Sequence, residues 1–209
     1  MDLSLYELYK TEVLSKVTLV LDIGVSDGVF LNRSAEYFSG NPRRIGIDPV
    51  VYKDFDRWSA VEFYEFAVSS KCGEVGYFIS EDKVGSSINN TLGNERVPSK
   101  RMDCFFEEIQ VQRFENIFVK IDTQGTEIDC LKSLGAYLED VSAIHVESWL
   151  RPFGSNGKYF ANTIQELDDL GFFVCEIIDP LRRSKDSKLG QIDLLCLRKN
   201  NRLYYDLEW

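Results

Sequence analysis

The stretch Val20-Leu21-Asp22-Ile23-Gly24-Val25-Ser26-Asp27-Gly28 decides the fold of this chain. It completes a short apolar run, Val17–Ile23, which is typical of a strand buried on both faces of a parallel sheet. After the glycine turn, Gly28–Ser39 carries apolar residues at helical spacing. A strand, a glycine turn and a helix in this order let a ligand approach the backbone amide groups. A plain structural turn is the alternative for such a short motif.

The glycine spacing in this turn separates two kinds of nucleotide cofactor. NAD-dependent oxidoreductases use G-x-G-x-x-G, in which the middle glycine admits a pyrophosphate. Here Ser26 holds the middle position and Gly28 falls one position early, which disfavours that class. Asp22, near the end of the strand, suits the cationic amino group of a methionine moiety and would repel a pyrophosphate. The turn therefore favours a ligand with a methionine moiety over a dinucleotide, with expected contacts from Asp22, Gly24, Ser26 and Gly28.

The next two strands supply further expected cofactor contacts. Asp48 ends the predicted strand Arg44–Asp48, about twenty residues beyond the turn, where an acid can hold both ribose hydroxyls. A turn-forming role before Pro49 is the alternative for this aspartate. The third predicted strand, Glu62–Val68, ends where adenine contacts are expected, from Ala67, Val68 and Ser69.

The rest of the chain alternates between strand and helix patterns. Strands are predicted at Asn116–Asp122, Ser142–Glu147, Phe172–Ile178 and Gln191–Leu197, and helices at Glu127–Leu138 and Thr163–Leu170. Gly76–Ile79 is predicted as a small hairpin strand before the polar loop Asp82–Asn94. The connection Asp179–Gly190 is too short for a crossover helix, so the last two strands should run antiparallel. The sequence thus predicts an α/β fold, a mostly parallel, doubly wound sheet with an antiparallel final strand.

These motifs, in this order, resemble the FkbM family of S-adenosylmethionine-dependent methyltransferases over nearly the whole chain after Thr18. The most specific stretch is Lys120-Ile121-Asp122-Thr123-Gln124-Gly125-Thr126-Glu127. Supporting stretches are the glycine turn, Ile45–Pro49, Ala67–Ser69, Gly85–Ser87, Val146-Glu147, Leu170–Phe172 and Gln191–Asp193. Family members usually carry Asn or Gly near Ser26, so the serine is a departure from the family pattern.

The resemblance implies a Rossmann-like class I methyltransferase fold, with S-adenosylmethionine as cofactor and S-adenosylhomocysteine as product. It extends the expected cofactor contacts to Pro49, Ser87 and Asp122. Many family members methylate hydroxyl groups of polyketides, sugars and lipid-linked glycans. The resemblance therefore implies a hydroxyl acceptor for this chain.

Two carboxylates are the candidate general bases for methyl transfer to a hydroxyl. Asp122 and Glu147 end neighbouring predicted strands, and Lys120 and His145 precede them by two positions on the same strand faces. Either carboxylate is expected to remove the acceptor proton, with Lys120 holding their ionisation or contacting the acceptor. His145 is a further candidate proton acceptor.

Structural roles remain open for each of these residues. Lys120 and Glu147 would form a buried charge pair, His145 a hydrogen-bonded core residue, and Asp122 a helix cap. Carboxylates at one edge could also hold Mg²⁺ or Ca²⁺, but no second aspartate stands beside Asp122, so no metal ligand is assigned.

The acceptor is expected to be a sugar or glycan hydroxyl. Enzymes acting on nucleobase amino groups carry an Asn/Asp-Pro-Pro-aromatic stretch where this chain has Asp122-Thr123-Gln124-Gly125. Aromatic residues after the Glu147 strand could stack on a sugar ring or pack in the core: Trp149, Phe153, Tyr159 and Phe160. The alternatives are another small-molecule hydroxyl or amine, or an inactive protein that only binds S-adenosylmethionine.

Charge disfavours a nucleic-acid partner. The chain has 34 acidic and 24 basic residues, a net charge of −10. Its dense basic clusters are Arg182-Arg183 with Lys185 and Lys188, and Arg198-Lys199 with Arg202. Both are expected to be solvated surface segments, whereas nucleic-acid binding needs extended basic surfaces. A local patch could still hold an anionic acceptor.

Composition favours one folded domain, residues 1–209, with an N-terminal helix over 1–16 and the cofactor-binding core over 17–209. The segment Asp2–Ser15 has the apolar spacing of an amphipathic lid helix. No apolar run is long enough to cross a bilayer, and no secretory leader is recognisable. Five widely spaced cysteines indicate buried free thiols. A cytoplasmic location is therefore expected.

Overall fold

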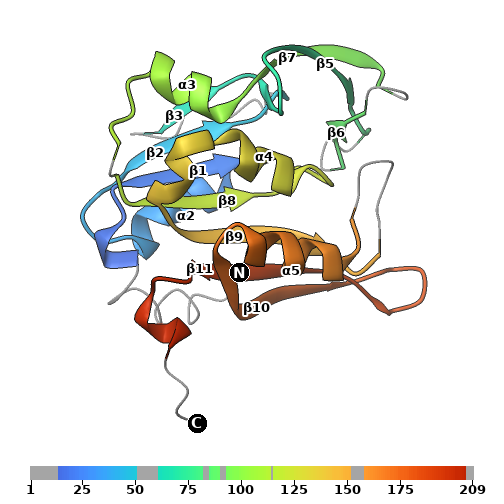
Figure 1. The fold of residues 1–209 in the computed structure, drawn as a ribbon. Helices are drawn as coiled ribbons and strands as arrows, with labels where there is room; N and C mark the ends of the chain where they lie inside the picture. Colours follow the sequence, from blue (N-terminus) through green and yellow to red (C-terminus); the bar gives the residue numbers. More distant parts are fainter. Residues whose placement is uncertain are drawn as a thin grey trace.

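A seven-stranded sheet runs through the molecule, in the order β10-β11-β9-β8-β1-β2-β3 (Figure 1). The computed structural model describes residues 14–50, 61–81, 85–89, 93–113, 115–151 and 158–205. The strands are β1 Leu19–Ile23, β2 Arg43–Ile47, β3 Glu62–Tyr64, β8 Ile117–Ile121, β9 Val141–Trp149, β10 Phe172–Arg182 and β11 Leu189–Arg198. The helices beside this sheet are α2 Val29–Tyr37, α4 Glu127–Ser133 and α5 Phe160–Asp169.

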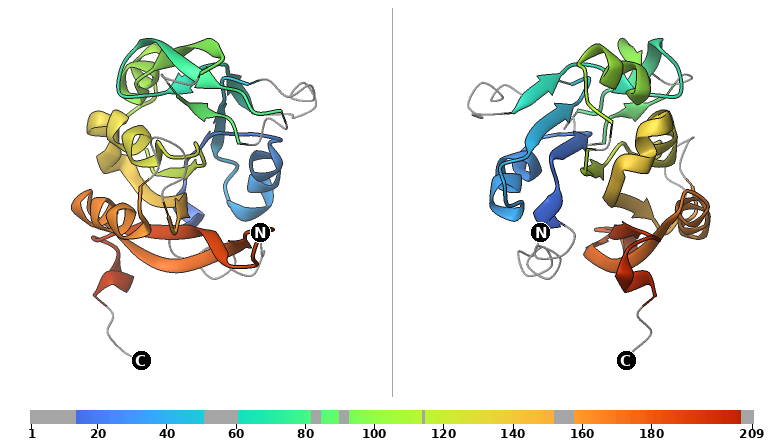
Figure 2. Two further views of the ribbon diagram at one scale, coloured as in Figure 1. Left: turned by 90° about the vertical axis from the view of Figure 1, so that its right-hand side faces the viewer. Right: turned by 60° about the vertical axis from the view of Figure 1, so that its left-hand side comes forward.

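Helices lie on both faces of this sheet, with α4 and α5 on one side and α2 on the other (Figure 2). Strand β1 shows why the sequence folds this way. Leu19, Leu21 and Ile23 join one buried cluster, and Val20 joins another that contains residues of α2. Because both faces of β1 are covered, it is apolar at almost every position.

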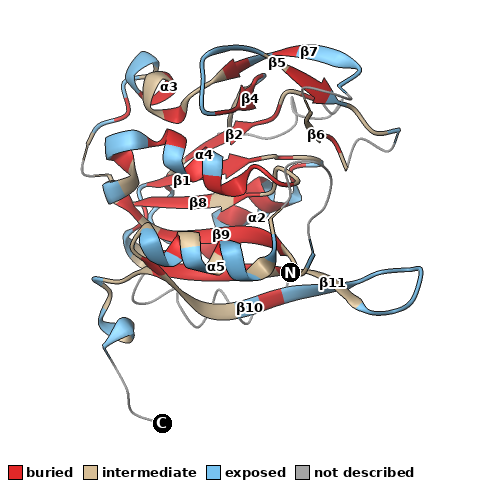
Figure 3. Ribbon diagram, turned by 45° about the vertical axis from the view of Figure 1, so that its right-hand side comes forward, coloured by how far each residue is buried: buried red, intermediate tan, exposed pale blue. Residues whose placement is uncertain are grey.

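The predicted strand directions are confirmed. Strands β9, β8, β1, β2 and β3 pair in parallel, while β11 pairs antiparallel with both β9 and β10. The fold is therefore a mostly parallel, Rossmann-like sheet with one antiparallel strand. The β10–β11 hairpin is longer than predicted and has register shifts between Val174 and Glu176 and around Leu181. Its outer part is exposed (Figure 3).

The third predicted strand was wrong in extent. Glu62–Val68 divides into β3 in the main sheet and β4, Ala67–Val68, in a second sheet of order β4-β7-β5-β6. This sheet also contains β5 Gly73–Phe78, β6 Ser87–Ile88 and β7 Glu95–Lys100. Strand β7 and helix α3, Met102–Glu108, were not predicted. Only Val97 and Ser99 of β7 are buried, so its sequence lacks a clear apolar alternation.

Two predicted helices end differently in the structure. The segment Glu127–Leu138 divides into α4 and a 3-10 helix, Gly135–Asp140, because Gly135 has a φ of +56° that breaks the α-helix. Of the predicted lid helix Asp2–Ser15, residues 2–13 lie outside the described residues, and Leu14–Lys16 is a 3-10 turn. None of the described helices is long and apolar enough to cross a membrane.

All five cysteines are free, but they are not all buried as expected. Cys130 and Cys196 are buried, Cys104 and Cys175 are half-buried, and Cys72 is exposed.

Candidate active site

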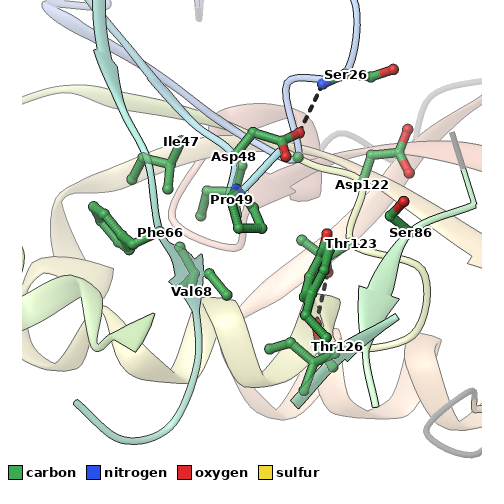
Figure 4. A pocket seen from close by; sticks show the side chains of 15 residues that line it. Ser26, Ile47, Asp48, Pro49, Phe66, Val68, Ser86, Asp122, Thr123 and Thr126 are labelled. Atoms are coloured by element: carbon green, nitrogen blue, oxygen red, sulfur yellow. Dashed lines mark hydrogen bonds between the residues drawn. The ribbon is translucent and has the colours of Figure 1, made fainter. Parts of the chain in front are cut away.

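A pocket with about 580 Å³ of empty space lies at the carboxyl ends of β1, β2 and β8, where the second sheet meets the first (Figure 4). Parallel α/β sheets bind ligands at this edge. Among the described residues, its lining comes from six segments: Ile23, Gly24 and Ser26; Ile47, Asp48 and Pro49; Phe66, Ala67 and Val68; Tyr77; Ser86 and Ile88; and Asp122, Thr123 and Thr126.

The glycine turn after β1 forms one wall of the pocket. Gly24 has a φ of +82°, and a Cβ atom there would lie 1.9 Å from the backbone oxygen of Asp122. Ser26 has a φ of +53°, and its backbone N–H donates to Asp48 Oδ2 at 3.0 Å. Gly28 precedes α2 with a φ of +71° and does not line the pocket. The turn is thus pressed against β8 and held by Asp48.

Asp48 lines the pocket and also organises the turns around it. Its two carboxylate oxygens accept the N–H groups of Ser26 and, at 2.8 Å, Val50. The side chain is nearly buried, and this burial raises the pKa of Asp48. Asp48 therefore stabilises the turns and also lies in a position suited to ribose contacts.

The opposite wall is apolar. Ile47, Phe66, Val68 and Ile88 line it with Pro49, giving a slot suited to a flat aromatic ring. Ser69 is not part of the lining.

Ser69 instead stabilises a turn: its Oγ donates to the backbone oxygen of Lys71 at 2.8 Å. In the next polar loop, Ser86 and Ile88 line the pocket and Ser87 does not. Ser87 and Ile88 form β6, and alternate residues of a strand face opposite sides.

Asp22 lies behind the pocket wall. It is fully buried, and its Oδ1 is 3.4 Å from Lys120 Nζ, while Oδ2 has no hydrogen-bond partner among the described residues. Burial raises the pKa of Asp22 to about 7, although Lys120 opposes the shift. The cation that the structure places beside Asp22 is therefore Lys120.

Asp122 and Glu147 are brought together by a shared partner. Gln124 Nε2 donates to Asp122 Oδ1 and to Glu147 Oε2, both at 2.9 Å. Asp122 lines the pocket with a side chain 37% exposed, whereas Glu147 is buried behind Gln124. Lys120 Nζ is 3.8 Å from Asp122 Oδ2, so the predicted pairing of Lys120 with Glu147 is replaced by pairing with Asp22 and Asp122.

Glu147 is held by three donors. Besides Gln124, Trp149 Nε1 donates to Oε2 at 2.9 Å, and Gln191 Nε2 donates to Oε1. Burial raises the pKa of Glu147 to about 9, and the negative charges of Asp122 and Glu127 add to the effect. Burial thus favours the protonated form of this carboxyl group.

His145 lies away from the pocket. Its ring is 1% exposed, its Nε2 is 2.8 Å from Asp193 Oδ2, and it meets the Phe30 ring edge-on. Lys120 and His145 are register partners on β8 and β9, so Asp22, Lys120, His145 and Asp193 form a polar row across four strands beneath α2. The structure thus supports the core role for His145.

Several pocket residues were not predicted. Phe66, Tyr77, Thr123 and Thr126 line the pocket without having been assigned to it. Thr123 and Thr126 belong to the most specific stretch of the family resemblance, so that stretch could have predicted them as pocket residues. Tyr77 comes from the second sheet, whose position no local pattern revealed.

Of the predicted aromatic wall, Trp149 borders the site, Phe160 packs on the main core and Tyr159 is 58% exposed. Phe153 lies outside the described residues. Among the described residues, no group of three or more His, Cys, Asp or Glu side chains is arranged to hold a metal ion.

A family model for the methyltransferase FkbM domain matches residues 15–174. The chain belongs to this family. The FkbM match confirms the resemblance read from the sequence motifs and makes the chain an S-adenosylmethionine-dependent methyltransferase. A search of curated protein sequences found no match.

Solved structures share the fold of this FkbM methyltransferase at low sequence identity. A "putative hemolysin" from Lactococcus lactis is 14% identical with a TM-score of 0.55, over 93% of this chain and 85% of that one. A "putative S-adenosylmethionine dependent methyltransferase" from Listeria monocytogenes is 11% identical with a TM-score of 0.50, over 93% and 96%. The magnesium protoporphyrin IX methyltransferase from Synechocystis PCC 6803, with bound SAH, is 10% identical with a TM-score of 0.50, over 93% and 80%.

The pocket suits S-adenosylmethionine in its chemistry. A carboxylate at Asp48 matches ribose hydroxyls, and the apolar slot matches adenine. Asp122, Thr123 and Ser26 provide polar groups near the glycine turn.

Proposed function

We propose that this FkbM methyltransferase transfers a methyl group to a hydroxyl of a sugar or glycan, with Asp122 as the general base. One observation carries this proposal: Asp122 alone among the candidate catalytic residues lines the pocket, with its carboxylate partly exposed. S-adenosylmethionine, when bound, supplies a methyl group on a sulfonium whose sulfur leaves with the bonding electron pair. The cofactor contacts proposed for the pocket are Gly24, Ser26, Asp48, Pro49, Ala67, Val68 and Asp122.

The surroundings of the two carboxylates favour Asp122 over Glu147 as the base. A general base must be ionised and within hydrogen-bond reach of the acceptor proton. Glu147 is buried, its oxygens are engaged by three donors, and its pKa is raised to about 9. Asp122 takes the proton as the acceptor oxygen bonds to the methyl carbon. Glu147 acts as a positioning residue that holds Gln124 against Asp122.

Lys120 assists by charge rather than by contact with the acceptor. Its side chain is 12% exposed and lies between Asp22 and Asp122, with Nζ at 3.4 and 3.8 Å from their carboxylates. Lys120 thus places a positive charge close to the carboxylate that lines the pocket. His145 has no part in the proton transfer, since Asp193 engages it away from the pocket.

The polar groups beside Asp122 suit a sugar. Gln124, Glu147 and Gln191 form a hydrogen-bonded cluster around the indole N–H of Trp149. Trp149 is half-buried and can present an apolar ring face beside polar groups. Sugars combine an apolar ring face with hydroxyls in the ring plane, so this pairing of an aromatic with amide and carboxyl groups is complementary to them.

The test is methylation of a panel of sugars, glycosides, phenols and amines, followed by mass spectrometry. We expect the label on a sugar hydroxyl, and Asp122→Asn should lower turnover by about 10²–10⁴-fold at saturating cofactor. Glu147→Gln retains an oxygen acceptor for Gln124, so its loss should stay within about tenfold. Methylation of amines only, or near-wild-type turnover by Asp122→Asn, would contradict the proposal.

A further inference from the structure

A second groove lies beside the active-site edge and has the opposite charge to the rest of the molecule. It holds about 980 Å³ of empty space between the end of β9 and the tip of the β10–β11 hairpin. Seven of the described residues line it: Trp149, Leu150, Arg151, Arg183, Lys188, Leu189 and Gly190. Three are cations and none is acidic, although the chain carries a net charge of −10.

The hairpin brings these cations to the side where an acceptor must approach. Strand β11 starts at the carboxyl edge of the parallel strands, and the hairpin tip extends past the ends of β8 and β9 (Figure 1). The N–H of Leu150 donates to the oxygen of Gly190 at 3.0 Å, which joins the end of β9 to the start of β11. The groove is therefore anchored to the strand that carries Glu147.

The turn that carries the cations is ordered by its own hydrogen bonds. The N–H of Arg183 donates to the oxygen of Lys188 at 2.9 Å, and Arg182 Nη1 donates to the oxygen of Ser187 at 3.0 Å. The stem of Arg183 crosses Gly190, where a Cβ atom would lie 2.8 Å from Arg183 Cγ. Glycine at this position thus lets the arginine lie across the strand.

The positive charges outnumber the carboxylate that faces them. Arg183 is paired with Asp186, and the Asp186 carboxylate is also attracted by Arg151, so that its pKa falls below the usual range. Within the described part of the chain, Lys188 has no ion-pair partner. Among the described residues, the groove is lined by three cations and has the Asp186 carboxylate beside two of them, so it has an excess of positive charge that attracts anions.

A continuous set of contacts leads from this groove to the proposed base. Trp149 lines the groove, its indole N–H bonds to Glu147, and Glu147 shares Gln124 with Asp122. Trp149 therefore borders the groove and also belongs to the hydrogen-bonded cluster that holds Asp122.

We infer that the groove lined by Arg151, Arg183 and Lys188 binds an anionic group of the acceptor, so that the substrate is an acidic saccharide. This inference rests on the proposed function and specifies its substrate class. The shared chemistry is a carboxylate, phosphate or sulfate on the sugar. Guanidinium groups bind such oxyanions through charge-assisted hydrogen bonds.

The experiment measures binding by calorimetry in the presence of S-adenosylhomocysteine. Two matched pairs of probes are used: p-nitrophenyl β-D-glucuronide against the glucoside, and 4-hydroxybenzoate against 4-hydroxybenzyl alcohol. Glucose 6-phosphate against glucose distinguishes a phosphate from a carboxylate. We expect tighter binding of the charged sugar, with a preference that declines at high salt.

Lys188→Glu should weaken binding of the preferred charged sugar about five- to tenfold and change the neutral sugar less than about twofold. Lys185→Glu is the matched control, because it makes the same charge change in the same exposed turn but lies outside the groove lining. Arg151→Gln provides a second, independent loss of groove charge.

Equal binding of charged and neutral probes would overturn the groove inference, as would equal effects of Lys188→Glu and Lys185→Glu. No binding by any probe would also overturn it. A charge preference confined to the benzoate pair, lost in Lys188→Glu, would retain the anion groove but refute the sugar acceptor. A neutral sugar that is bound and methylated as well as its charged counterpart would retain the sugar acceptor but refute the anion groove.

Discussion

Gly24 lies so close to β8 that no side chain fits there. A Cβ atom would be 1.9 Å from the Asp122 oxygen and 2.8 Å from its carbonyl carbon, and the φ of +82° is unfavourable for other residues. The obstacle is backbone, which cannot rotate away as a side chain can. The glycine therefore positions the proposed base as well as the turn.

Gly24→Ala should lower the free energy of unfolding by about 3 kcal/mol or more, because backbone strain and a backbone clash add. Urea denaturation measures the change. Gly40→Ala is the matched control: its φ is +89°, but nothing lies within 4 Å of its Cβ position. It should cost only about 1–2 kcal/mol. Equal losses in the two variants would show that contact with Asp122 is unimportant.

The raised pKa of Glu147, about 9, predicts a pH dependence of stability. The unfolded chain releases this proton near pH 4.3, so between about pH 5 and 9 the folded state holds one proton more. The free energy of unfolding should therefore fall as pH rises through this range. Glu147→Gln lacks this proton, so its stability should improve relative to wild type from pH 5 to pH 9.

Urea denaturation of both proteins at pH 5, 7 and 9 measures this difference. The exposed Glu36→Gln provides the control, because it makes the same substitution at the surface. A constant difference for Glu147→Gln would mean that Glu147 is ionised in the folded protein.

At the scale of elements, the main sheet carries a polar row across β1, β8, β9 and β11 beneath α2. Asp22 and Lys120 are register partners, as are Lys120 and His145, and His145 bonds to Asp193. Burying charges is unfavourable unless they are paired, so the members depend on one another. The row also brings Lys120 within 3.8 Å of the pocket carboxylate Asp122.

Lys120→Met should lower the free energy of unfolding by about 3–5 kcal/mol at pH 8, because it leaves Asp22 buried without a cation. The loss should be smaller at pH 5, where Asp22, with a pKa raised to about 7, is protonated. The double variant Asp22→Asn, Lys120→Met should recover most of the stability. Equal losses in the single and double variants would indicate that the Lys120 stem acts through packing alone.

At the scale of the whole molecule, the cofactor pocket joins the two sheets. The main sheet contributes Gly24, Asp48 and Asp122, whereas the second sheet contributes Ala67, Tyr77 and Ile88, with Ser86 beside it. A ligand in this pocket contacts both sheets. Its binding should therefore add to the stability that the second sheet has from contacts within the protein. The basic hairpin lies at the other side of the same edge, beyond β9.

S-adenosylhomocysteine should slow amide hydrogen exchange in β5 and β6 as well as in the turn after β1. At about 100 times its Kd, one ligand adds about 2.7 kcal/mol to the free energy of unfolding. Exchange measured by mass spectrometry, with and without the ligand, tests this prediction. The far end of the main sheet, helix α5 and the C-terminal half of β11, is the internal control. Protection limited to the β1 turn would contradict a site shared by both sheets.

Local patterns in the sequence were sufficient for the frame of the molecule. The apolar run before Gly24, the acids Asp48 and Asp122 at strand ends, and the short connection Asp179–Gly190 predicted the parallel sheet, its antiparallel strand and part of the pocket wall. These features depend on neighbours along the chain and on the rule that parallel strands present their carboxyl ends at one edge.

Tertiary structure alone decided which carboxylate is exposed, which cation faces it and where the second sheet closes the pocket. Asp122 and Glu147 have equivalent places at strand ends, yet one lines the pocket and the other is buried behind Gln124. The sequence predicted the basic segment near Arg183 as a solvated loop. In the structure, the hairpin places this segment beside Trp149. Burial and charge balance depend on distances between residues remote in the chain, and no local pattern encodes those distances.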